Sequence, residues 1–271
     1  MKVTVEQLQQ ELEKQGLMDL VEKHRGAEEV PHLLNRFLVA RKHKLKDAMK
    51  MIRQDLEWRE TEKVLEIRNR TSREVLNAEI NPQGKQLHDE LFPHGFLGTC
   101  RMGRPVLYLR FGRDFDAEKL DKNAHLTHED LARYNIWMME RVAAKMNFEG
   151  QWVVVVDLEG WHLGQMTIRN MKYVKQFADK NSLHYPERAG KIFLINVPSV
   201  FSKCWSLMKP WLDDVTREKI GLYRSPEQWI PAISELMDLS MLPKRVGGNA
   251  NLEYDSHSLD PSDSEYRTVT A

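Results

Sequence analysis

Two short runs of apolar residues limit the possible folds of this chain more than any other feature. Residues 152–160 read WVVVVDLEG, and residues 192–197 read IFLINV. Neither run alternates between apolar and polar positions, so each predicts a strand that is apolar on both faces. Such a strand must be covered on both sides, as in the middle of a sheet that has helices on each face.

The segments around these runs predict an α/β fold. Residues 106–112, VLYLRFG, mix β-branched and aromatic residues and end at a glycine, which indicates another strand. Residues 126–146 and 168–177 have helical periodicity, and Thr127 with Asp130 forms a variant of the capping box at the start of the first helix. Strands that alternate with helices pair in parallel through crossovers, although an antiparallel edge strand would leave no such mark.

The amino-terminal residues 5–73 predict consecutive helices, with a break at Pro31. Residues 94–105, HGFLGTCRMGRP, contain three glycines and are expected to form a loop. Residues 249–271 are rich in Ser and Asp and poor in aliphatic side chains. We expect this last segment to be a disordered acidic tail, because it cannot bury enough apolar surface to fold.

The charge of the chain argues against nucleic acid as a partner. The formal net charge at pH 7 is +0, so no field of the whole chain attracts a polyanion. One local stretch is basic, and in it only Asp47 opposes seven cations: Arg36, Arg41, Lys42, Lys44, Lys46, Lys50 and Arg53. This stretch is either a solvated helix face or a local patch for an anionic partner.

The chain has the features of a cytoplasmic protein. Its amino terminus is too polar for the apolar segment of a signal peptide, and no run approaches the ~18 apolar residues of a spanning helix. Cys100 and Cys204 are far apart and lack the spacing of metal ligands, so we expect reduced thiols. Membrane contact, if it occurs, is expected to be peripheral and transient.

No catalytic motif is found, and we expect no enzyme activity, metal or cofactor. The sequence lacks a nucleophile elbow, a phosphate-binding P-loop and a dinucleotide-binding glycine motif. Asp157 and Glu159 follow a central strand and are two residues apart, as the carboxylates of a hydrolase could be. The alternative is that these carboxylates cap a helix or fix a loop at the strand end.

Residues 200–220, VFSKCWSLMKPWLDDVTREKI, combine a long apolar helix face with a cluster of charges. The apolar side chains are too numerous for one narrow stripe: Val200, Phe201, Cys204, Trp205, Leu207, Met208, Trp211 and Leu212. A helix that is apolar on two sides needs a second partner, which could be another helix, a bilayer surface or a lipid.

Seven motifs together resemble the CRAL-TRIO lipid-transfer family, and most closely its phosphatidylinositol-transfer branch. In order they are LLNRFLVARK, EWRE, GRPVLYLR, VVVVDLEG, YPERAGKIFLINVPSVF, KPWLDDVTREKI and PKRVGG, and they extend from residue 33 to residue 248. The resemblance implies a helical amino-terminal subdomain, 1–75, and an α/β lipid-binding domain, 76–248, whose mixed, mostly parallel sheet floors an apolar cavity. A mobile amphipathic gate helix within about 201–223 would cover this cavity.

The resemblance also implies two sets of site residues. The inositol headgroup would be bound by residues that match the family in type: Arg41, Lys42, Glu187, Thr216 and Lys219. The cavity or its gate would be formed by apolar residues: Val154, Val156, Phe201, Trp205, Met208, Trp211, Val215 and Ile220. Relatives that also bind phosphatidylcholine have Ser and Thr where this chain has Trp152 and Val154, which argues against that second lipid.

The function implied by the resemblance is binding of phosphatidylinositol, or a related phospholipid, and its exchange between membranes without chemistry. A second hypothesis is a lipid-gated scaffold or presenter for a lipid kinase or a small GTPase. A third is a carrier for another hydrophobic ligand, such as a sterol precursor or tocopherol. A liposome transfer assay separates the first hypothesis from the second.

Overall fold

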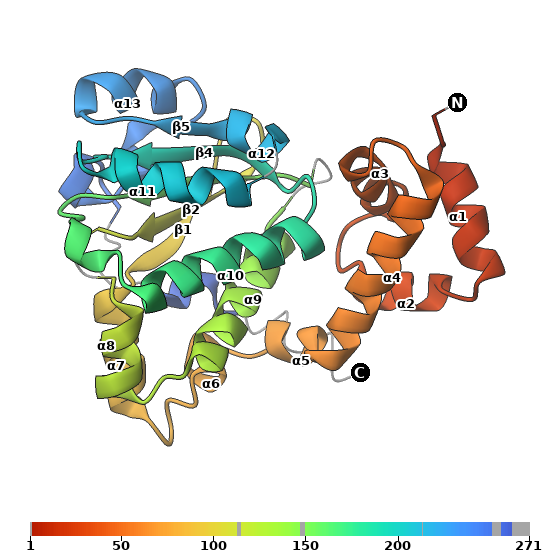
Figure 1. Ribbon diagram of the computed structural model, residues 1–271, viewed down its shortest axis with the longest axis horizontal. Helices are drawn as coiled ribbons and strands as arrows, with labels where there is room; N and C mark the ends of the chain where they lie inside the picture. Colours follow the sequence, from red (N-terminus) through yellow and green to blue (C-terminus); the bar gives the residue numbers. More distant parts are fainter. Residues whose placement is uncertain (1, 113–114, 147–149, 213, 251–255, 262–271) are drawn as a thin grey trace.

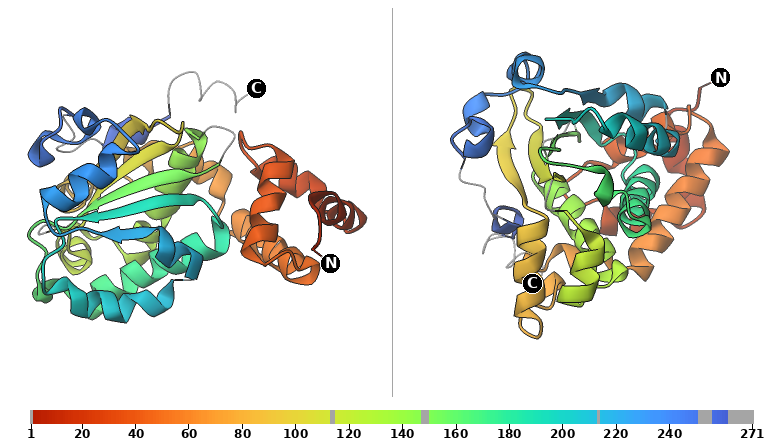
Figure 2. Two further views of the ribbon diagram at one scale, coloured as in Figure 1. Left: turned by 90° about the horizontal axis from the view of Figure 1, so that it is seen from above. Right: turned by 60° about the vertical axis from the view of Figure 1, so that its left-hand side comes forward.

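The computed structural model describes residues 2–112, 115–146, 150–212, 214–250 and 256–261. A helical bundle lies beside a larger α/β unit (Figure 1), and the left-hand view of Figure 2 shows the same arrangement from above. The bundle contains α1 (Val5–Lys14), α2 (Met18–His24), α3 (Val30–Ala40) and α4 (Leu45–Thr61).

The α/β unit contains one five-stranded sheet and the remaining helices. Its strands are β1 (His94–Thr99), β2 (Pro105–Arg110), β3 (Trp152–Asp157), β4 (Ala189–Ile195) and β5 (Ile220–Leu222). Its helices are α5 (Val64–Arg68), α6 (Ser72–Val75), α7 (Pro82–Leu91), α8 (Ala117–Ala124), α9 (His128–Ala144), α10 (Ile168–His184), α11 (Phe201–Met208), α12 (Asp214–Lys219) and α13 (Pro226–Ser234). Short 3-10 turns are η1 (Leu163–Gln165), η2 (Lys209–Trp211), η3 (Leu239–Met241), η4 (Lys244–Val246) and η5 (Ser256–Leu259).

The helical bundle has a core of its own. Its apolar side chains repeat at helical spacing and are buried together: Leu8, Leu12, Val21, Leu34, Phe37, Leu38, Ala48, Met49, Met51, Ile52 and Leu56. The helices that follow belong elsewhere, because Val64, Ile67 and Val75 are buried in the core of the α/β unit and α5 packs on α9. The packing therefore changes near the end of α4. The boundary expected from the sequence lies later, at residue 75.

The sheet has the order β1-β2-β3-β4-β5, and all its neighbours from β2 to β5 are parallel. The predicted α/β fold, with strands β2, β3 and β4 at its centre, is confirmed. The capping box at Thr127 and Asp130 is confirmed as well, since each residue's side chain accepts from the other's backbone. Side chains of β3 alternate between the two faces of the sheet. Val153 and Val155 pack under α13, while Trp152 and Val154 face the layer of α9 and α10.

The expectation of a loop over residues 94–105 is wrong for its first half. His94–Thr99 form the edge strand β1, which pairs antiparallel with β2 and contains a bulge between Phe96 and Gly98. Gly98 has φ +105°, which a residue with a side chain rarely adopts. The glycines that indicated a loop therefore belong to a bulged edge strand.

The expectation of a disordered tail is wrong for residues 256–261. Leu259 is fully buried, and its carbonyl accepts a hydrogen bond from Arg141 Nε at 2.7 Å. Asp260 accepts from the backbone nitrogen of Ser72 at 2.6 Å, and the Ser258 hydroxyl accepts from that of Phe96 at 2.9 Å. This segment thus fastens onto β1, α6 and α9. The rest of the predicted tail, 251–255 and 262–271, lies outside the described residues.

The expectation of one gate helix is also wrong. Residues 201–222 form α11, the 3-10 turn η2, α12 and then β5. Pro210 lacks the amide hydrogen that would bond to the carbonyl of Ser206, which favours a break in the α-helix at this point. Leu212 is extended, with φ −102° and ψ 139°, and this separates the two helices. The apolar and charged halves of the segment are therefore different helices.

Candidate functional site

An apolar cavity of about 740 Å³ lies between the sheet and the helices α10, α11 and α12. This volume is within the usual range for ligand sites, ~300–1,000 Å³. Its floor is formed by side chains that alternate along three strands: Leu107, Leu109, Trp152, Val154, Val156, Ile192 and Leu194. These positions are apolar, and because side chains alternate along a strand they share one face of the sheet, the face opposite to α13.

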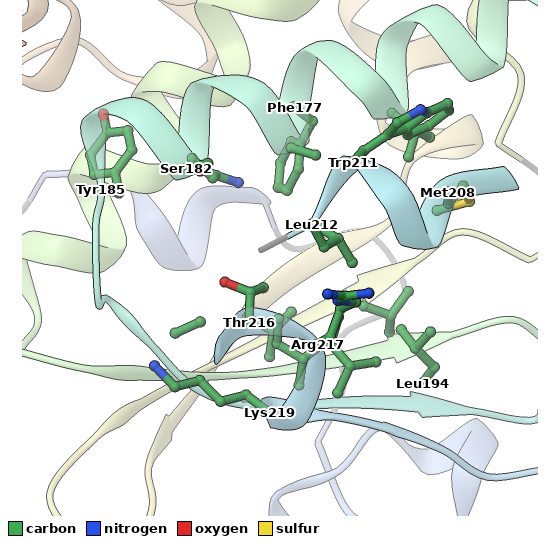
Figure 3. Close-up of a pocket in the computed structure, with 18 of the residues that line it drawn as sticks. Phe177, Ser182, Tyr185, Leu194, Met208, Trp211, Leu212, Thr216, Arg217 and Lys219 are labelled. Atoms are coloured by element: carbon green, nitrogen blue, oxygen red, sulfur yellow. The ribbon is translucent and has the colours of Figure 1, made fainter. Parts of the chain in front are cut away.

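One wall of the cavity is a stripe along α10. Its members recur every three or four residues, so they lie on one face of the helix: Met171, Val174, Ala178, Asn181 and Tyr185 at the helix end. Figure 3 shows Phe177, Ser182 and Tyr185 along this wall, opposite Thr216 and Lys219. The periodicity of residues 168–177 predicted the helix, and it could also have indicated this face.

The broken segment 201–220 covers the cavity. Phe201 and Cys204 are buried, and the Phe201 ring meets Trp161 edge to face with their centroids 5.1 Å apart. Met208, Trp211 and Leu212 approach the cavity from the end of α11 and from η2 (Figure 3). The outer side of α11 faces solvent, and the Leu207 residue there is 57% exposed. The cover is thus apolar toward the cavity, while its solvent side exposes Leu207 among the polar residues Ser202, Lys203 and Ser206.

Charged and polar side chains gather at one end of the cavity. Lys219, the last residue of α12, donates from Nζ to Glu187 Oε2 at 3.0 Å. Arg41 and Lys42, which follow α3, line the same cavity, as do Thr216 and Arg217. Arg217 is paired with Asp214 one turn earlier in α12. This end therefore offers several cations, a hydroxyl and a carboxylate beside an apolar interior.

The structure brings together all the residues for which the resemblance implied a site. The five residues expected at a headgroup and the eight expected at the cavity or gate all line this one cavity. Their placement is a property of the structure, whereas their roles toward a lipid stay predictions. The sequence reasoning missed other wall residues, including Trp161, Phe177 and Asn181, because α10 and the loop before it were not connected with the cavity.

Gln165 and Asn170, two polar side chains of the cavity lining, are satisfied within the protein, whereas the buried Oδ1 of Asn181 has no hydrogen-bond partner among the described residues. Gln165 donates to the carbonyls of Gly112 and Phe115, and Asn170 donates to the carbonyl of Gln165. Burial raises the pKa of the Cys204 thiol to about 11, so this thiol is neutral near pH 7 and acts as a small apolar wall group. A ligand in this part of the cavity would meet an apolar surface.

The carboxylates considered for hydrolysis have structural roles. Asp157 is fully buried, and it accepts hydrogen bonds from the Tyr108 hydroxyl at 2.8 Å and from Asn196 Nδ2 at 2.9 Å. Its other close partners are the Glu159 backbone nitrogen and Arg245, which also pairs with the Glu159 side chain. Neither carboxylate lines the cavity. The alternative of a loop-fixing aspartate accounts for this cluster.

Two further searches cover only the described parts of the chain. Within those parts, no group of three or more His, Cys, Asp or Glu side chains is arranged to hold a metal ion. Likewise, no helix of the described residues is long and apolar enough to cross a bilayer.

An apolar cavity with a sheet as its floor, a helical cover and a charged end is a site suited to an amphipathic ligand. The CRAL/TRIO domain family matches residues 91–248, which is more than half of the 271 residues. The chain belongs to this family, and the resemblance drawn from its motifs is confirmed.

Curated relatives share about a quarter of their residues with this chain. Protein real-time of Drosophila pseudoobscura pseudoobscura is 27% identical over 225 residues, which are 79% of this chain and 31% of that protein. The phosphatidylinositol/phosphatidylcholine transfer protein SFH4 of Arabidopsis thaliana is 29% identical over 230 residues, 80% of this chain and 35% of that protein. The chain therefore spans about a third of the length of these two relatives.

Another relative is similar in length. The SEC14 cytosolic factor of Candida glabrata is 27% identical over 270 residues, 96% of this chain and 81% of that protein. Among solved structures, the crystal structure of Sfh5 matches with a TM-score of 0.66 at 17% identity, and covers 89% of this chain and 80% of that one. The last match supports the fold, including the helical amino-terminal region.

Proposed function

We propose that this protein binds one phosphatidylinositol molecule in the cavity and exchanges it between membranes without chemical change. The observation that carries the proposal is the charged end of the cavity, where Lys219, Glu187, Arg41, Lys42 and Thr216 line the same space. Cations suit the phosphodiester, while a carboxylate and a hydroxyl can bond to the inositol hydroxyls. The acyl chains would occupy the apolar interior between the sheet and α10.

The names of relatives support this ligand. SFH4 of Arabidopsis thaliana is named as a phosphatidylinositol/phosphatidylcholine transfer protein, and CSR1 of Eremothecium gossypii is named as a phosphatidylinositol transfer protein. CSR1 is 28% identical over 229 residues, 83% of this chain and 48% of that protein. In this proposal the helical bundle of α1 to α4 contributes Arg41 and Lys42, and the α/β unit binds the lipid.

The energetics favour exchange over permanent binding. Burial of two acyl chains of roughly 16–18 carbons contributes about 0.8 kcal/mol per methylene, more than 20 kcal/mol in total. A bilayer offers nearly the same gain, so the net free energy of transfer is small. A protein of this kind works in the cytoplasm and touches membranes only transiently.

The outer surface of the cover supports contact with a membrane. Leu207 and Val200 are exposed on the α11 side of the cavity, at 57% and 39%. On the helical bundle, cations that follow Arg41 along the chain are exposed, namely Lys42, Lys44, Lys46, Lys50 and Arg53. Exposed apolar side chains and exposed cations are each suited to an anionic membrane surface.

Loading and transfer can be tested separately. Native mass spectrometry of the protein after incubation with mixed liposomes is expected to show a phosphatidylinositol adduct of one lipid per chain. Transfer of labelled phosphatidylinositol between liposomes is expected to require the protein. If the protein loads no glycerophospholipid from any liposome mixture, the proposal is wrong.

Phosphatidylcholine is not expected as a second ligand. Trp152 and Val154 lie on the cavity floor, where Val154 has no polar atom and Trp152 has only an indole N–H in place of the hydroxyl of the family's Ser or Thr. The Trp152 ring is 4% exposed and packs near Tyr185, with centroids 6.1 Å apart. Its volume fills floor space that a smaller side chain would leave to a ligand.

A second candidate is a lipid-gated presenter for a lipid kinase or a small GTPase. The exposed cations of the helical bundle favour it, since a protein with an acidic surface could dock there. Loading of phosphatidylinositol without transfer between liposomes would select this candidate. Transfer by the protein alone would select the first.

A further inference from the structure

Two neighbouring residues of the turn between α10 and β4 extend their side chains in different directions. Glu187 faces the cavity and pairs with Lys219, whereas the next residue, Arg188, extends to Glu28 of the helical bundle. Glu187 has φ +59°, in the left-handed region that non-glycine residues rarely adopt. Such a conformation persists only where the surroundings hold it. The contacts that hold this turn therefore determine where the Glu187 carboxylate lies.

Those contacts come from the helical bundle. Arg36 of α3 donates from Nη1 to the carbonyl of Pro186 at 2.7 Å, directly before Glu187. Arg188 Nη2 donates to Glu28 Oε2 at 2.6 Å, directly after it. Arg36 also donates two hydrogen bonds to the Glu28 carboxylate, from Nε at 2.8 Å and from Nη2 at 2.7 Å. One carboxylate of the bundle thus fixes both arginines, and the two arginines hold both sides of the turn.

The cluster of Glu28, Arg36 and Arg188 is enclosed and closely packed. The exposed fractions of the Glu28 and Arg188 side chains are 6% and 8%. Arg188 Nη1 donates to the carbonyl of Gly150 at 2.9 Å, and a Cβ atom at Gly150 would lie 2.9 Å from this same nitrogen. Charge-assisted hydrogen bonds between buried groups are directional, so these three side chains have little freedom to move. The turn is therefore held in one arrangement.

We propose that Glu28, Arg36 and Arg188 are positioning residues for the charged end of the cavity, and that the helical bundle sets headgroup selectivity through them. These three side chains do not line the cavity. They act by placing the Glu187 carboxylate opposite Lys219. The bundle thereby acts on the headgroup by two routes: directly through Arg41 and Lys42, and indirectly through this turn. This inference rests on the proposed function, because it assumes that Glu187 bonds to inositol hydroxyls.

The test measures lipid choice, since a merely structural role would lower all loading alike. The full chain is incubated with liposomes that contain equal amounts of phosphatidylinositol and phosphatidylglycerol with the same acyl chains. Both lipids carry one phosphodiester, so the ratio of their adducts in native mass spectra reports the headgroup alone. We expect Glu28→Gln to lower the phosphatidylinositol to phosphatidylglycerol ratio about fivefold to tenfold, the effect of one weakened charge-assisted bond.

A double variant shows whether Glu28 acts through Glu187. Glu187→Gln alone is expected to lower the same ratio, and Glu28→Gln added to it is expected to cause no further change. If the losses in lipid ratio of the two single variants multiply in the double variant, the inference is wrong. It is also wrong if Glu28→Gln lowers the loading of both lipids equally. If the unaltered protein loads phosphatidylglycerol as well as phosphatidylinositol, the proposed function is at fault, and not the role of the turn.

Two further variants control for stability. Asp89→Asn removes one partner of the Lys85–Asp89 pair in α7, which lies at the opposite end of the α/β unit from the bundle (Figure 1). It is expected to lower the melting temperature without changing the lipid ratio. Should Glu28→Gln fail to fold by circular dichroism, Arg36→Met leaves the Glu28–Arg188 pair in place and removes the bonds of Arg36 to Pro186 and to Glu28. A shifted ratio in Arg36→Met supports the inference, and an unchanged ratio overturns it.

Discussion

Lys219 and Glu187 are joined by an ion pair of 3.0 Å at the charged end of the cavity. Lys219 ends the covering helix α12, whereas Glu187 belongs to the fixed turn before β4. Each side chain is only 20% exposed, so the pair is partly shielded from solvent. This ion pair ties the cover of the cavity to its framework at the charged end.

Lys219→Ala is expected to weaken phosphatidylinositol loading by tenfold to a hundredfold. The variant removes a charge-assisted bond of about 1.5–3 kcal/mol. The measurement is loading from liposomes, with phosphatidylglycerol for comparison. Lys203→Ala is the matched control, because Lys203 is an exposed cation of α11 in the same covering segment. If both lipids decline equally in Lys219→Ala, Lys219 is a structural cation.

Phe201 and Trp211 are expected to respond differently to replacement by Ala. Phe201 is 4% exposed and packs on Trp161, so Phe201→Ala should destabilise the fold by about 3–5 kcal/mol. Trp211 lies in η2 and is only partly buried, so Trp211→Ala should slow lipid transfer at a smaller cost in stability. Urea unfolding and transfer rates measure the two effects. Equal destabilisation by both changes would show that Trp211 is a core residue.

Leu207→Glu is expected to reduce binding to liposomes several-fold and to leave the fold unchanged. The side chain is 57% exposed on the outer side of α11, where it could insert into a membrane surface but supports no core. Co-sedimentation with liposomes measures binding, and a melting curve monitors the fold. Ser206→Glu places the same charge on the neighbouring exposed residue and should have a weaker effect. Equal effects of the two variants would attribute the loss to charge alone.

Acid is expected to destabilise the protein through His94. Burial, with repulsion from His88, lowers the pKa of His94 to about 3, far below the ~6.5 of an unfolded chain. The unfolded state therefore binds a proton below pH ~6.5 that the folded state does not, and the free energy of unfolding declines by about 1.4 kcal/mol per pH unit. Stability from His94 is complete above pH ~6.5 and is lost as the pH falls toward 3.

Urea unfolding between pH 7 and pH 5 measures this slope. In His94→Gln the slope should be smaller by the contribution of one histidine, whatever the stability of the variant at pH 7. Asp89 contributes only at lower pH. Burial raises its pKa, but the His88 hydrogen bond and the Lys85 charge outweigh this, and the net pKa is about 2. An unchanged slope in His94→Gln would mean that other histidines control acid stability.

The sequence predicted the centre of the fold because the relevant patterns are local. The unbroken valines of β3 can only form a buried strand, and the cap at Thr127 marks a helix start within four residues. The edges could not be predicted in this way. β5 has three residues, and β1 carries glycines, so both are held by backbone pairing with a neighbour that the local sequence does not reveal.

The site was predicted as a set of residues but not as a geometry. The motifs that carry the resemblance include Glu187 and Lys219, and the structure places them together. The contacts behind them were beyond reach of the sequence, since Glu28 and Arg188 are 160 residues apart. The covering segment was misread as one helix because its apolar side chains continue past Pro210, although the proline was the available signal of a break.

The short segment around Leu259 affects how the protein can be synthesised. It closes the core of the α/β unit, yet its partners Phe96 and Ser72 were made 162 and 188 residues earlier. During translation the helical bundle can fold first, whereas the surface formed by β1, α6 and α9 stays uncovered until residue 259 leaves the ribosome. Contacts of such long sequence separation also slow folding. A nascent chain of this protein is therefore expected to expose this surface to chaperones from the completion of α9 at Ala144 until Leu259 has emerged.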